Sequence, residues 1–209
     1  MTKLFGGLKM SWLVVALFAV CAGVYTGIVA SIPLSDGTSF RDIAISLEWW
    51  VIFAFVIAAN CGKTWESALK IFAFFVISQP LVYLVEVLVG HLDSGQAWYY
   101  YSSIWGPATL LTLPGGFIAF FIKKQNPLGC VVLGLGCALQ VALGLSYVLQ
   151  MLGNPPFHLL SALVCFGSAA VFIGGIQESK ERRAATACVA LAAVVLLLAV
   201  MLLTGRVLA

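Results

Sequence analysis

The chain has 209 residues, of which 62% are hydrophobic and only 9% are charged. Soluble proteins carry roughly 25% charged residues, so a soluble particle of this composition could not cover its surface. The same apolar excess excludes a disordered chain, a collagen-like repeat and a small disulfide-stapled secreted domain. The net charge of +3 is too small to indicate a nucleic-acid partner. The composition therefore predicts a protein whose solvent is the lipid bilayer.

Seven apolar stretches are long enough to cross a bilayer, whose core needs about 20 residues per helix. In chain order they are 11–33, 43–60, 68–90, 105–122, 128–151, 157–176 and 185–203. Backbone polar groups that have no water to bind are satisfied within a helix. We therefore predict an all-α fold, a polytopic membrane bundle of seven transmembrane helices that forms a single integral-membrane domain.

The distribution of positive charge predicts how these helices are threaded. With the N-terminus in the cytoplasm, nine of the 11 Lys and Arg residues fall on the inner side, and Arg41 and Arg206 fall outside. The nine are Lys3, Lys9, Lys63, Lys70, Lys123, Lys124, Lys180, Arg182 and Arg183. An odd number of spans then places the C-terminus outside. We expect an integral protein of the bacterial cytoplasmic (inner) membrane, with the first span retained as an anchor.

The acidic residues show the opposite bias. Five of the eight Asp and Glu residues fall in the outer half, namely Asp36, Asp42, Glu48, Glu86 and Asp93. An acidic outer mouth would concentrate cations and repel anions. The bias is explained equally well as the passive complement of the positive charge inside.

Two carboxylates fall within predicted spans, where an ionisable group costs up to about 3.5 kcal/mol to insert. Glu48 lies about six residues into the second span, or about 9 Å deep, and Glu86 lies near the outer end of the third. These spans are antiparallel neighbours, so the two carboxylates could approach each other and share a proton or a cation. For Glu48 we favour a functional role over an ion pair with Arg41. Glu86 could instead extend to the outer headgroups.

Two spans carry polar stripes at helical spacing. Gln79, Tyr83 and Glu86 follow one another at i, i+4 and i+7, which places them on one face of a helix. Pro80, beside them, removes a backbone donor and frees a carbonyl one turn earlier. The fifth span repeats the pattern with Gln140, which is followed by Gly144 and Tyr147. Gln140 is favoured more as a hydrogen bond between helices than as a ligand group, and the tyrosines could be interfacial anchors.

The fourth span contains Pro107, Pro114, Gly115 and Gly116, which predict a kinked or unwound helix. Discontinuous helices of transporters expose carbonyls and helix ends at their binding sites, so these residues and Pro80 are candidates for a gating break. A packing kink that lets helices approach closely is an equally good interpretation.

Further features of the sequence favour packing and anchoring. Gly23 and Gly27 form a Gly-x-x-x-Gly pair that suits tight helix packing within one chain or between protomers. The run Trp98–Tyr101 indicates an aromatic belt at the outer interface, with a lid over an outer cavity as the weaker interpretation.

The chemistry of a membrane enzyme is missing from the sequence. The six cysteines are scattered without a Cys-x-x-Cys motif, and the two histidines, His91 and His158, stand alone near outer ends. No catalytic triad, HExxH motif or phosphate loop occurs. We therefore expect no enzymatic activity, no cofactor and no metal site.

These patterns favour a small multi-pass transporter, or the substrate-binding subunit of one, for a small neutral or cationic solute. Glu48 and Glu86 would hold a proton or coupling cation, and Gln79, Tyr83 and Gln140 would hydrogen-bond the solute near mid-membrane.

Two other classes remain open. A non-catalytic accessory subunit would use the same polar residues to join helices and would place Gly23 and Gly27 against a partner subunit or a second copy. An oligomeric channel is the weaker alternative. The expected partners are the lipid bilayer, a small solute and a second membrane chain, which could be another copy of this protein. We expect no nucleic-acid partner.

Overall fold

The computed structural model describes residues 10–90, 95–153 and 157–204, and every regular element in these ranges is a helix. Lys3, Lys9, His91, Asp93 and Arg206, which entered the predictions above, lie outside the described residues. The chain divides into two compact units. The N-terminal unit is Gly7–Phe120, and the C-terminal unit is Phe121–Ala209 together with Met1–Gly6.

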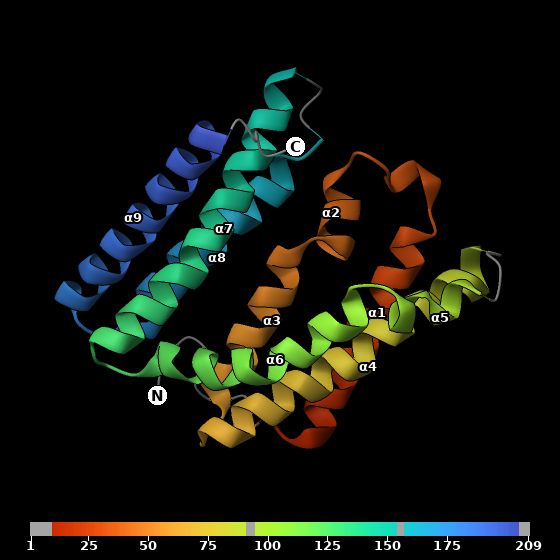
Figure 1. Cartoon of the computed structure of the whole chain (residues 1–209), viewed down its shortest axis with the longest axis horizontal. Coiled ribbons are helices and arrows are strands. Elements are labelled where there is room, and N and C mark those ends of the chain that lie inside the picture. Colours follow the sequence, from red (N-terminus) through yellow and green to blue (C-terminus); the bar gives the residue numbers. More distant parts are fainter. Residues whose placement is uncertain (1–9, 91–94, 154–156, 205–209) are drawn as a thin grey trace. The chain divides into compact units, whose positions relative to one another are not determined.

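The N-terminal unit is built around three helices that lie side by side: α1, α4 and α6 (Figure 1). Its elements are α1 (Trp12–Ala30), the short 3-10 helix η1 (Pro33–Ser35), α2 (Ser39–Ile45), α3 (Leu47–Asn60), α4 (Thr64–Gly90), α5 (Gln96–Ser102) and α6 (Trp105–Ala119). The last of these continues into the 3-10 helix η2 (Phe120–Lys123). Because α4 packs against α1 on one side and α6 on another, it is the central helix of this unit.

The C-terminal unit consists of α7 (Pro127–Gly153), α8 (Leu159–Ile176) and α9 (Lys180–Thr204), with α7 packed against both of the others (Figure 1). Two predicted inner loops lie together at one end of it. The Gln125 side-chain amide donates to the Ile176 carbonyl at 2.9 Å and accepts from Arg182 at 3.2 Å. The loop after η2 is thereby fastened to the loop before α9.

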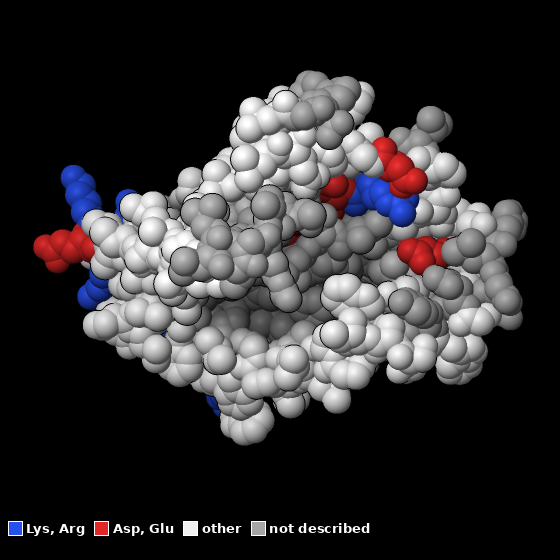
Figure 2. All heavy atoms as spheres, turned by 45° about the horizontal axis from the view of Figure 1, so that its top comes forward, with Lys and Arg blue, Asp and Glu red and all other residues white. Residues whose placement is uncertain are grey.

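Six helices in the described part of the chain are long and apolar enough to cross a membrane. They are Trp12–Ala30, Thr64–Gly90, Trp105–Lys123, Pro127–Leu152, Leu159–Ile176 and Lys180–Val200. Figure 2 shows a face on which charged side chains are few and most of the surface is uncharged. Many leucines and valines are exposed, such as Leu191 and Leu196 of α9, as lipid-facing side chains would be. The architecture fits an integral membrane protein of all-α class.

The second predicted span differs from the sequence prediction. Instead of one helix over 43–60, the chain forms α2, an extended residue at Ser46 (φ −77°, ψ 156°), and then the 14-residue α3. At 1.5 Å per residue α3 is about 21 Å long, which is short of a hydrocarbon core of about 30 Å. Ser46 is the N-cap residue of α3, a position that serine favours over a helix interior. A seventh span and the orientation of the termini therefore stay predictions.

The helices that contain the prolines continue past them, so the fourth span is not unwound, while a kink and a gating role stay predictions. Pro80 lies inside the continuous α4, and Pro114 lies inside the continuous α6. Pro107 falls in the first turn of α6, where the missing N–H would have no partner within the helix. Gly116 allows close packing, because a Cβ there would stand 2.7 Å from the Ala68 Cα of α4. Gly115 is exposed with open space around it.

Close packing of α1 on α4 depends on the Gly-x-x-x-Gly pair, and the prediction of tight packing is confirmed. A Cβ on Gly23 would stand 2.7 Å from the Ser78 carbonyl oxygen, and a Cβ on Gly27 would stand 2.6 Å from the Val85 Cβ. Both distances are far below van der Waals contact. The pair is therefore used within the chain.

We expect Gly27→Leu to destabilise the N-terminal unit by about 1–3 kcal/mol, because the new side chain overpacks the contact of α1 with α4. Gly115→Leu is the matched control, since its Cβ meets nothing within 4 Å. The free energy of unfolding in mixed micelles measures both variants. Equal stability of the two would contradict the assigned contact.

The polar stripe of the fifth span faces α8. A Cβ on Gly144 would stand 3.0 Å from the Phe166 ring, and Tyr147 forms a buried cluster with Ala162 and Cys165. Gln140, one turn before Gly144, is fully buried. The stripe is therefore part of the packed interior of the C-terminal unit.

Candidate solute-binding cavity

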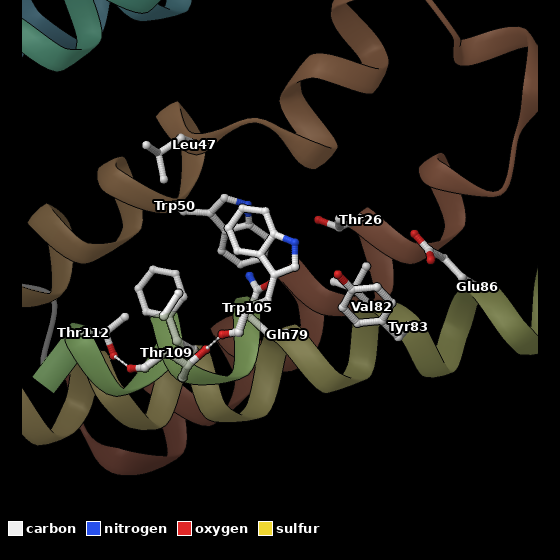
Figure 3. Close-up of a pocket in the computed structure, with 12 residues that line it drawn as sticks. Thr26, Leu47, Trp50, Gln79, Val82, Tyr83, Glu86, Trp105, Thr109 and Thr112 are labelled. Carbon is white, nitrogen blue, oxygen red and sulfur yellow. Dashed lines mark hydrogen bonds between the residues drawn. The ribbon is translucent and has the colours of Figure 1, made fainter. Parts of the chain in front are cut away.

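A cavity of about 270 Å³ lies within the N-terminal unit, between α1, α3, α4 and α6 (Figure 3). Its walls combine aromatic rings, uncharged polar groups and a carboxylate. They are formed by Thr26, Leu47, Trp50, Phe75, Gln79, Val82, Tyr83, Glu86, Trp105, Ala108, Thr109 and Thr112. This volume is slightly below the roughly 300–1,000 Å³ of drug-sized pockets, so it suits a small solute.

Helix α4 supplies the longest wall. Phe75, Gln79, Val82, Tyr83 and Glu86 recur at helical spacing, so one face of the helix lines the cavity along its length. Eleven residues separate the first from the last, a rise of about 16 Å. The cavity is therefore elongated along α4, with Glu86 at one end and Thr112 of α6 at the other (Figure 3).

The wall formed by α6, which packs beside α4, is fixed by hydrogen bonds of α5 and α6. The Thr109 hydroxyl lies 2.9 Å from the Trp105 carbonyl, to which it donates, and accepts from the buried Tyr100 hydroxyl at 2.9 Å. The Thr112 hydroxyl donates to the Thr109 carbonyl at 2.6 Å. These hydroxyl protons are already used within the protein. What the threonines of α6 offer to the cavity is therefore acceptor oxygen.

Gln79 and Glu86 have no hydrogen bond or ion pair with any residue in the described part of the chain. Arg41 acts on Glu86 only through its longer-range charge, because its guanidinium is paired with Asp36 and donates to the Ala30 carbonyl at 3.3 Å. Both side chains are partly buried and line the cavity. Their polar groups are therefore open to a group that enters the cavity.

The structure brings together only some of the residues predicted to form the site. Gln79, Tyr83 and Glu86 line the cavity, whereas Glu48 does not, although its neighbour Leu47 does. Glu48 is fully buried in the first turn of α3, where the positive end of the helix dipole stabilises a carboxylate. It was expected deeper in a longer helix. Gln140 belongs to α7 of the C-terminal unit.

Several wall residues were missed in the sequence as candidates for the site. Trp105, Thr109 and Thr112 form a stripe at i, i+4 and i+7 on α6 that could have been read as a second polar face. The two prolines of this span drew attention to a break instead. For Trp50, the sequence does not distinguish a residue of a cavity wall from an interfacial anchor, because the role of this side chain depends on where α3 packs.

The aromatic run Trp98–Tyr101 is divided between two environments. Trp98 and Tyr101 are 70% and 62% exposed, as expected of an interfacial belt, whereas Tyr100 is 5% exposed. The buried Tyr100 bonds to Thr109 and lies 6.2 Å, centroid to centroid, from the Tyr83 ring. The short helix α5 thus supports the cavity wall without lining the cavity.

A second cavity of about 480 Å³ lies between α1 and α3 and shares Trp50 and Thr26 with the first. Its other wall residues are mainly apolar, including Phe18, Trp49 and Phe53, and none is charged. It lacks the carboxylate and the amide that distinguish the first cavity.

The long apolar helices are those of a polytopic α-helical membrane protein. The first cavity, along α4, has polar groups on its wall. Comparison of the chain with protein-family models, with curated proteins and with solved structures gives no match. Any function must therefore be argued from the site itself.

Proposed function

We propose that this protein is a small multi-pass membrane transporter, or the substrate-binding subunit of one, and that it binds a small neutral or cationic solute in the cavity along α4. The observation that carries the proposal is the pair of open polar groups on that wall. Gln79 and Glu86 face a cavity inside an apolar helical unit, and no described residue satisfies them. Polar groups in a membrane helix are costly and commonly mark a solute or ion pathway.

The alternative of an accessory subunit loses one of its supports. Gly23 and Gly27 were the residues assigned to a partner, and they pack on α4 of the same chain. A stoichiometric partner that copurifies with a protein showing no flux would favour the accessory role. Conductance in planar bilayers would favour the oligomeric channel.

The experiment is uptake into proteoliposomes of a panel of small neutral, cationic and anionic solutes. We expect flux of a neutral or cationic member and none of anions. Gln79→Leu should reduce that flux by about tenfold or more, because the lost hydrogen bond leaves a polar group of the bound substrate without its partner. Gln150→Leu, the same change at an exposed position of α7, should leave it unchanged. Full flux in Gln79→Leu would show that the cavity does not lie on the transport path.

A further inference from the structure

We propose that the cavity along α4 selects a monovalent organic cation, an ammonium or guanidinium group attached to an apolar body. The inference rests on the proposed function and specifies its substrate class. The carboxylate, the aromatic walls, the available hydrogen-bond groups and the elongated shape each support it.

The charge of the wall favours a cation. Glu86 is the charged residue of the lining, which contains no Lys or Arg. Arg41, which acts on Glu86 from a distance, has its own acidic partner in Asp36. The Glu86 carboxylate would repel an anion that enters the cavity and would attract a cation. A single positive charge balances the site.

The aromatic side chains extend this preference to organic cations. Trp50, Tyr83 and Trp105 line the same cavity as Glu86 (Figure 3). Tyr83 lies one helical turn from Glu86 on α4, so its ring can attract a cation held at that carboxylate. The indole rings of Trp50 and Trp105 offer apolar contact to the rest of the ligand. A bare metal ion gains little here, because Ca²⁺ and Mg²⁺ need about six oxygen ligands, and the described residues contain no cluster of three metal-binding side chains.

The hydrogen-bonding groups of the cavity wall also favour a cation. The hydroxyls of Thr109 and Thr112 have already donated their protons to backbone carbonyls. Their remaining lone pairs, with the Glu86 carboxylate, accept hydrogen bonds. An ammonium or guanidinium group supplies donors and no acceptor, which is the complementary set.

The elongated shape of the cavity determines the orientation of the bound ligand. Glu86 lies at one end of the cavity and the Trp50 and Trp105 rings lie near its middle (Figure 3). A cationic head at Glu86 therefore leaves the apolar body beside the indole rings.

Equilibrium binding to the full chain in nanodiscs tests the inference, with empty nanodiscs as background. The probes are benzylammonium, the neutral N-benzylacetamide and the anionic benzylsulfonate, which share one aromatic body. We expect the cation to bind about tenfold or more tightly than either of the others, a difference of about 1.4 kcal/mol. Glu86→Gln should abolish the preference, and Glu86→Asp should retain most of it. Glu181→Gln, at an exposed acidic residue of α9, should have no effect.

Equal binding of the cationic and neutral probes, both weakened by Gln79→Leu, would overturn the cationic class while keeping the cavity as a solute site. Binding of the cation that is unchanged in both Glu86→Gln and Glu86→Asp would also overturn it. If benzylammonium does not bind at millimolar concentration, the inference is wrong whatever the uptake panel shows. Loss of the proposed function itself would appear separately, as absence of flux for every solute.

Discussion

Lys70→Met is expected to destabilise the N-terminal unit by about 3 kcal/mol, near the lower end of the range for breaking a buried ion pair. The Lys70 side chain is almost fully buried in α4. Its ammonium bonds to the Met10 carbonyl just before α1, forms an ion pair of 2.5 Å with Glu66, and lies 5.7 Å from the Trp12 ring centroid. Removing it leaves a carboxylate and a carbonyl without their cation. We expect a value near the lower end of that range because about one third of the Glu66 side chain is exposed, so solvent partly compensates its charge.

A double variant separates the ion pair from general disruption. Lys70→Met combined with Glu66→Gln removes both charges, so it should lose less stability than Lys70→Met alone. Lys180→Met, at an exposed residue of α9, is the control for removing a lysine. Unfolding free energies by SDS titration in mixed micelles provide the measurement. A double variant no more stable than Lys70→Met alone would show that the pair is not the source of the effect.

The buried lysine also shows where charge counting reaches its limit. The positive-inside pattern treats Lys70 as an inner-side marker, although it lies inside α4 with its charge satisfied by the protein. Hydropathy and charge identify which stretches are helical, because both depend on composition along the chain. They do not show whether a given charge faces water or a partner from another helix.

Helical periodicity predicted the wall of the cavity that α4 forms but not the walls that other helices form. Gln79, Tyr83 and Glu86 lie on one face because that spacing is fixed by 3.6 residues per turn. Which helix meets that face depends on packing contacts such as Gly116 against Ala68, and no local pattern specifies them. The pairing of Glu86 with Trp50 and Trp105 in one cavity was therefore outside the reach of the sequence.

Two local interpretations were changed by competing backbone preferences. Ser46 begins a new helix, which places Glu48 in a first turn and outside the cavity lining. The prolines of the fourth span were interpreted equally as a gating break or a packing kink, and the helix continues past both, because a first-turn proline is compatible with a helix and Pro114 is accommodated within α6. In both cases the residue types were identified and their positions within a helix were not.

Water access is the property that separates a solute cavity from a packed interior. Thr112 of α6 lines the cavity, and its neighbour Leu111 is 69% exposed on the outside of the same helix. Cysteine substitutions at these two positions report two environments one residue apart. Cys21 and Cys188, the exposed cysteines of the described chain, are first replaced by alanine.

The rate at which a membrane-impermeant, positively charged methanethiosulfonate modifies Thr112→Cys and Leu111→Cys tests the account most directly. Reaction requires a thiolate, which forms in water and not in lipid. We expect Thr112→Cys to react about tenfold or more faster than Leu111→Cys, with benzylammonium slowing the reaction. Equally slow modification at both positions would show that the cavity is dry and would contradict the account.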